Sequence, residues 1–126
     1  MGDRAMAEIK TRDGSLFVYT HWGGRDLPED ARDAVLAAKP RWHDIPYATR
    51  IIVDQLTKEG RDRETGFGLM PTPNAEDEYN ADKPSVIIDL KYQVLTIIRN
   101  DVRRDYSFSR LDEIGIKGGV VWRREE

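Results

Sequence analysis

The chain has 126 residues, of which 39% are hydrophobic and 34% charged, and its 20 basic against 23 acidic residues leave a formal net charge of −3. This is the length of one ordinary domain, and the apolar content is sufficient for a core. The charge balance argues against a strongly basic protein that binds bulk nucleic acid, and equally against a strongly acidic mimic of DNA.

Cysteine is absent from the chain, which removes disulfides, thiolate metal sites and cysteine nucleophiles. Nothing requires an oxidising compartment, so we expect a cytoplasmic protein. No apolar run approaches the roughly 20 residues of a membrane span, and we expect no membrane partner. We expect one domain over residues 1–126, with Met6 as the native start and residues 1–5 as an added remnant.

The first predicted elements are the two strands of a β-hairpin. Residues 7–11 and 15–22 form the strands, and the turn between them contains Asp13-Gly14, a typical hairpin dipeptide.

Two helices are predicted to follow the hairpin. Residues 28–38 carry an apolar stripe at helical spacing, and Asp26 stands where it can cap the first turn. Residues 46–58 carry a second stripe, with Asp44 as the cap and Gly60 at the expected left-handed C-terminal position.

The remainder of the chain reads mainly as strands joined by turns. The predicted strands are residues 65–70, 84–90, 94–99 and 106–108, with a long polar loop over 71–83, a short helical turn over 109–114 capped by Ser109, and an edge strand or extended tail over 119–123. Consecutive strands with short turns favour antiparallel pairing. We therefore predict a single α+β domain: a mainly antiparallel sheet of about five strands, with two helices packed on one face. The predicted core residues are Ile52, Leu56, Val86, Ile88, Leu95 and Ile97.

Both histidines lie in clusters of unusual side chains, at residues 21–25 and 41–44. A histidine pair can serve as acid and base in phosphodiester cleavage. However, His21 and His43 lack the H-x-[ST] pattern of two-histidine phosphoesterases, and we expect a catalytic role for neither. No spacing predicts a metal site or a serine nucleophile, so we expect no metal and no cofactor.

Arginine supplies 14 of the 20 basic residues, a bias typical of planar recognition and stacking. An aromatic–arginine pocket suits a nucleotide or a phosphopeptide. We predict that any functional pocket is built by Trp22, Arg25, Trp42, Tyr47 and Arg50, with Tyr79 closing from the long loop. The alternative is structural: Trp42 and Tyr47 pin the helices to the sheet, and Arg50 pairs with Asp54.

Several short strings resemble a set of small uncharacterised proteins encoded in bacteriophages and prophages. The strings are Tyr19-Thr20-His21-Trp22-Gly23-Gly24, Arg41-Trp42, Pro46-Tyr47, Arg50-Ile51, Thr65-Gly66-Phe67-Gly68 and a strand at Val86–Asp89. The resemblance spans about residues 16–98. It implies an accessory phage protein that acts in the host cytoplasm by binding and neutralising a host component.

The function we expect is therefore non-catalytic binding of a host protein or a signalling nucleotide. Two alternatives stay open: an enzyme of nucleotide or phosphodiester chemistry that uses His21 or His43, and a structural virion component assembled through sheet edges. Self-association into a homo-oligomer is also left open.

Overall fold

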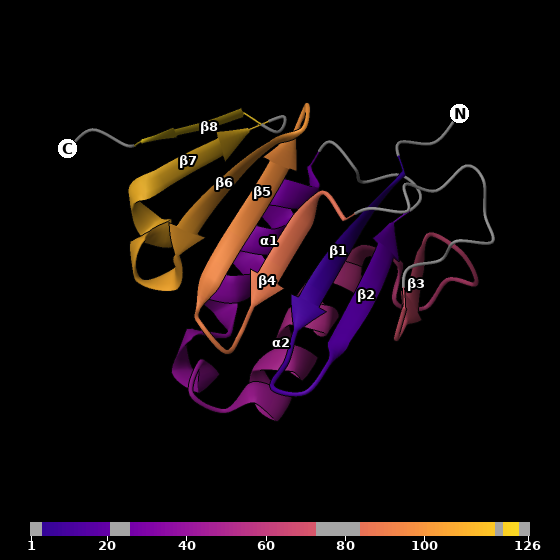
Figure 1. Cartoon of the computed structure of the whole chain (residues 1–126). Helices are drawn as coiled ribbons and strands as arrows, with labels where there is room; N and C mark the ends of the chain where they lie inside the picture. The colour runs from indigo at the N-terminus through magenta and orange to yellow at the C-terminus, as the bar shows by residue number, and fades with distance from the viewer. Residues whose placement is uncertain (1–3, 21–25, 73–83, 118–119, 124–126) are drawn as a thin grey trace.

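The computed structural model of the protein describes residues 4–20, 26–72, 84–117 and 120–123 (Figure 1). The strands are β1 (Ala5–Lys10), β2 (Ser15–Thr20), β3 (Phe67–Met70), β4 (Val86–Asp89), β5 (Val94–Arg99), β6 (Val102–Ser107), β7 (Ile114–Lys117) and β8 (Val120–Arg123). The α-helices are α1 (Leu27–Ala37) and α2 (Ile45–Thr57), and the short 3₁₀ helices are η1 (Lys39–Arg41), η2 (Lys58–Gly60) and η3 (Phe108–Glu113).

The main sheet contains six strands in the order β3-β2-β1-β4-β5-β6. Its neighbouring strands are antiparallel, except that β1 and β4 run parallel. A second sheet pairs β7 with β8. The predicted α+β class is confirmed, with six strands in the main sheet in place of about five.

The parallel pair lies at the centre of the sheet, where Ala7 is paired with Val86 and Ile9 with Ile88. Strand β4 is apolar on both faces, since Val86, Ile87 and Ile88 are all buried. A parallel neighbour requires a long crossover, and the chain from β2 through both helices and β3 supplies it. Parallel strands are predicted from a strand–helix–strand alternation in the sequence. These elements do not alternate in that way, so the sequence did not predict the parallel pair.

Both α-helices cover the same face of the main sheet (Figure 1), as predicted. The six predicted core residues are all buried there: Ile52, Leu56, Val86, Ile88, Leu95 and Ile97. Fully buried alanines, among them Ala31 and Ala48, let the helices approach their neighbours closely. No helix among the described residues is long and apolar enough to cross a membrane.

The helix ends lie within one residue of the predicted bounds, but their capping differs. Asp26 and Asp44 occupy the predicted N-cap positions, and neither side chain makes a capping hydrogen bond. The predicted left-handed conformation of Gly60 is wrong, because α2 continues into η2 and Gly60 does not have a positive φ. A Cβ at Gly60 would lie 2.9 Å from the ring of Phe67, so close packing explains this glycine.

The C-terminal strands differ most from the prediction. Strand β6 begins at Val102 because Asn100 and Asp101 form a two-residue turn with φ values of 52° and 64°, which both residue types tolerate. Ser107 rather than Ser109 precedes the helical turn η3. Of the two alternatives for residues 119–123, the strand is the one observed, as β8.

We expect Leu95→Ala to lower the free energy of unfolding by about 2–4 kcal/mol, because it leaves a cavity in a closely packed core. Leu95 is fully buried, whereas Val102 is 52% exposed. Val102→Ala is therefore the control, and should change stability by less than about 0.5 kcal/mol. Urea denaturation measures the free energy of unfolding of both variants. Equal losses in the two variants would contradict the assignment of Leu95 to the core.

Candidate functional site

Two cavities lie toward opposite ends of the helix pair. The first, which we call the α2 groove, lies between the β1–β2 turn and the start of α2 and has a volume of about 650 Å³. Its lining residues are Thr11, Arg12, Asp13, His43, Asp44, Ile45, Pro46 and Thr49. This volume is within the range of small-molecule sites, about 300–1,000 Å³.

The α2 groove combines polar groups of both charges with a short apolar wall. Arg12 and His43 provide nitrogen donors, and Asp13 and Asp44 provide carboxylates. The hydrogen bonds of α2 begin with the Ala48 N–H, which donates to the Asp44 carbonyl. The backbone N–H groups of Ile45 and Tyr47, before that point in α2, have no intrahelical acceptor and form the positive end of the helix dipole.

Trp42 lies beside the α2 groove and has a structural role. Its Nε1–H donates to the Val35 carbonyl at 2.8 Å, and its ring centroid lies 5.1 Å from that of Phe108. These contacts join the segment before α2 to α1 and to η3. The structural alternative had Trp42 pin the helices to the sheet, whereas these two contacts tie it to α1 and η3. Trp42 does not line either cavity.

Tyr47 and Arg50 lie on the exposed side of α2. The Tyr47 side chain is 55% exposed, and the Arg41 guanidinium lies 5.4 Å from its ring centroid. Arg50 is also exposed. The expected pairing of Arg50 with Asp54 is wrong, because Asp54 forms its ion pair with Arg61 at 2.6 Å.

The other residues of the predicted site, Trp22, Arg25 and Tyr79, lie outside the described residues, as does His21. The described half of the site consists of Trp42, Tyr47 and Arg50. None of these three residues lines either cavity, but neighbouring residues of the same segment, from His43 to Thr49, line the α2 groove.

The second cavity, which we call the α1–β3 pocket, lies between the start of α1, the end of α2 and the start of β3. It has a volume of about 320 Å³. Its lining residues are Thr20, Leu27, Asp30, Leu56, Glu59, Gly60, Arg63, Thr65, Gly66 and Phe67.

The Asp30 carboxyl has a clearly displaced pKa. Partial burial, followed by repulsion from Asp26, Asp33 and Glu29, raises the pKa of Asp30 from 3.8 to about 6, against the opposing effect of Lys58. The residue still keeps more than a third of its surface exposed. The carboxyl is therefore partly enclosed at the pocket wall, and water continues to screen it.

Two glycines shape this pocket. Gly60 leaves room for the Phe67 ring, two carbons of which would lie 2.9 Å from an added Cβ. Gly66 has a φ of 110°, a conformation that other residues adopt only with strain. In the Thr65-Gly66-Phe67-Gly68 string, a Cβ at Gly66 would meet nothing within 4 Å, and one at Gly68 would lie 3.8 Å from Tyr19, an ordinary contact distance. The positive φ of Gly66, and not a close approach of the backbone, therefore distinguishes this string.

No family model, curated protein or solved structure matches this chain.

The raised pKa of Asp30 predicts a pH-dependent effect of Asp30→Asn on stability. A carboxyl whose pKa is higher in the folded state stabilises the fold below its unfolded pKa, and this contribution is lost as the pH rises through the folded pKa. With values of 3.8 and about 6, the variant should match the parent near pH 4 and melt a few degrees higher at pH 7.5.

Thermal denaturation across this pH range tests the prediction. Asp112→Asn removes the same charge from an exposed residue of η3 and serves as the control. A difference in melting temperature between Asp30→Asn and the parent that does not change with pH would contradict the account of this carboxyl.

Proposed function

We propose that this protein is a non-catalytic accessory protein of phage type that binds a nucleotide-type ligand of the host and neutralises it by occupancy. The observation that carries the proposal is the α2 groove of about 650 Å³, bordered by an exposed tyrosine and by arginines. The resemblance to phage and prophage proteins supports the same kind of role.

The groove and its border offer complementary groups for both parts of a nucleotide. The exposed Tyr47 ring, with the Arg41 guanidinium beside it, provides a surface on which a base can stack. Arg12 in the groove and the exposed Arg50 provide charged donors for phosphate oxygens, which bind arginine in charge-assisted pairs. Asp13 and Asp44 reduce the local positive charge, which favours a ligand with few phosphates.

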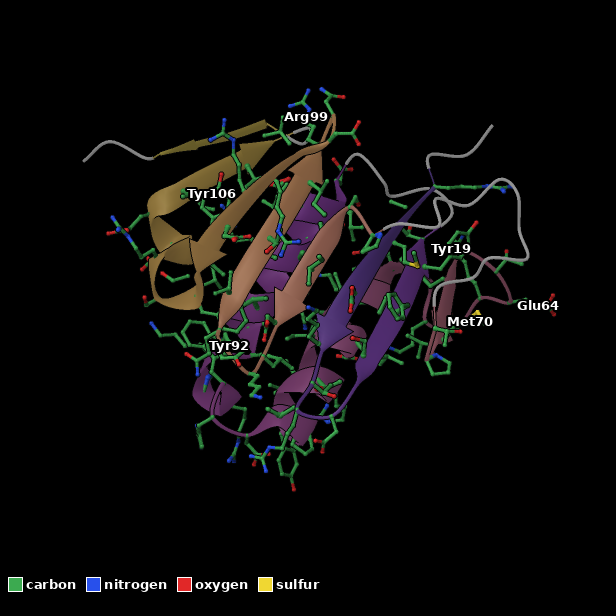
Figure 2. The ribbon with its side chains drawn as sticks, in the orientation of Figure 1. Tyr19, Glu64, Met70, Tyr92, Arg99 and Tyr106 are labelled. Atoms are coloured by element: carbon green, nitrogen blue, oxygen red, sulfur yellow. The ribbon has the colours of Figure 1, made fainter. Side chains whose placement is uncertain are left out.

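A host protein is the second candidate partner, and exposed aromatic residues at the same end of the molecule favour it. Tyr92 is 71% exposed and Tyr47 is 55% exposed, and Figure 2 shows Tyr92 at the turn between β4 and β5. The neighbouring Gln93 carbonyl accepts the N–H of Phe108, the residue that the Trp42 ring contacts. Exposed aromatic and arginine side chains are enriched at binding hot spots.

The enzyme alternative also has a place in the groove, because His43 lines it beside Asp44. Catalysis by two histidines needs His21 as well, which lies outside the described residues. A binding protein returns its ligand unchanged and an enzyme returns product, so the two functions are separated by the same experiment.

The experiment is a calorimetric titration with cyclic and linear ribonucleotides, followed by recovery of the nucleotide. We expect one nucleotide to bind with one site per chain and to be recovered intact. Arg50→Ala and Arg12→Ala should each weaken binding about tenfold through loss of a charge-assisted hydrogen bond. Arg104→Ala removes the same charge from exposed strand β6 and should bind as the parent does.

Three results would contradict the proposal. Recovery of a cleaved nucleotide would favour the enzyme. Capture of one host protein from a lysate, lost in Tyr47→Ala and without any nucleotide binding, would favour the second candidate. Concentration-dependent oligomers that bind no nucleotide would favour the virion component.

A further inference from the structure

The floor of the α1–β3 pocket is apolar and closely packed. Leu27 and Leu56 are almost fully buried, at 4% and 6% exposure, and the Phe67 ring packs directly on Gly60. A ligand that enters this pocket therefore needs an apolar part, since a wholly polar one would lose water contacts at the floor without replacing them.

The rim of the pocket is negatively charged. Asp30 and Glu59 line it against one guanidinium, that of Arg63. Asp26 at the N-cap and Glu29 and Asp33 on α1 repel the charge of Asp30, and Lys58 opposes them. The positive end of the α1 dipole is therefore already matched by carboxylates, and an anionic ligand would meet net repulsion.

We propose that the α1–β3 pocket binds a small organic cation, an ammonium or guanidinium group carried on an apolar stem. The stem contacts Leu27, Leu56 and Phe67, and the cationic head pairs with Asp30 at the rim and is within the field of Glu59. This site is separate from the α2 groove, so it does not depend on the proposed nucleotide binding.

The size of the pocket limits the cation. A volume of about 320 Å³ is at the lower end of the range for small-molecule sites, and suits a single ring or a short chain. The same chemistry can come from a free amine or from a lysine side chain of another protein. A phenethylammonium ion represents the first source, and Nα-acetyl-lysine methylamide represents the second.

The state of Asp30 gives the binding a characteristic pH dependence. A cation prefers the ionised carboxylate, so binding should release a proton and should strengthen as the pH rises through the pKa of Asp30, about 6. Between pH 5 and pH 7.5 the affinity for phenethylammonium should rise about tenfold and then level off.

The test is a titration of the intact chain with phenethylammonium at pH 7.5, followed by backbone amide chemical shifts. Phenethyl alcohol, which has the same stem without the charge, is the matched ligand control. We expect shifts at Leu27, Gly60 and Gly66, and tighter binding of the ammonium than of the alcohol. Asp30→Asn should weaken the ammonium about tenfold and leave the alcohol unchanged, whereas Asp112→Asn should alter neither.

The lysine amide distinguishes the two sources of the cation. Tighter binding of phenethylammonium than of the lysine amide supports a free amine, and the reverse supports a protein side chain. The inference is overturned if the alcohol binds as tightly as the ammonium, if Asp30→Asn binds the ammonium normally, or if neither cation shifts the amides of this pocket.

Discussion

The parallel pairing of β1 with β4 joins the two halves of the main sheet. It places the N-terminal hairpin beside the apolar strands β4 and β5 in one sheet, although both helices and β3 intervene in the sequence. Ile9 and Ile88 are paired across this boundary and are fully buried. The chain must therefore cross the sheet through α1 and α2, and the apolar face of the sheet is covered by both. The two cavities lie toward opposite ends of the helix pair within this crossover.

Local signals in the sequence predict most of the helices and strands. They do not predict how elements far apart in the sequence are arranged. Proline in the first turn of each helix, together with the apolar stripe through Ala31 and Val35 in α1 and the stripe through Ile52 and Leu56 in α2, predicts both helices from local sequence. The place of β4 beside β1 depends on a crossover that no short window contains. The start of β6 depends on the left-handed backbone conformation of Asn100 and Asp101. This conformation makes a two-residue turn, so that Val102 already pairs with Arg99. Gly60 was misread because its reason is the ring of Phe67, and that contact becomes visible only after folding.

In the candidate site, too, local sequence signals were informative and long-range contacts were not predicted. The sequence drew attention to residues 41–50 through their aromatic and arginine content, and this segment does border the larger cavity. Trp42 was the misleading member, because its hydrogen bond to Val35 and its contact with Phe108 serve the fold. The sequence did not predict the α1–β3 pocket, because its acidic and apolar walls come from elements that are far apart in the sequence: α1, α2 with η2, and β3. The available signal was the run of acids from Asp26 to Asp33, which disfavours an anionic ligand at the start of α1. That reasoning agrees with a pocket for cations.

The two proposals together place sites of opposite charge preference at the two ends of the helix pair. A map of backbone amide shifts, with a mixture of the four ribonucleoside monophosphates and phenethylammonium added in turn to one sample, tests this directly. The nucleotides should shift amides within residues 11–13 and 43–49, and the ammonium should shift amides within residues 27–30 and 56–67. Neither probe should displace the other. Shifts from both probes in one common set of residues, or displacement of one probe by the other, would contradict this placement.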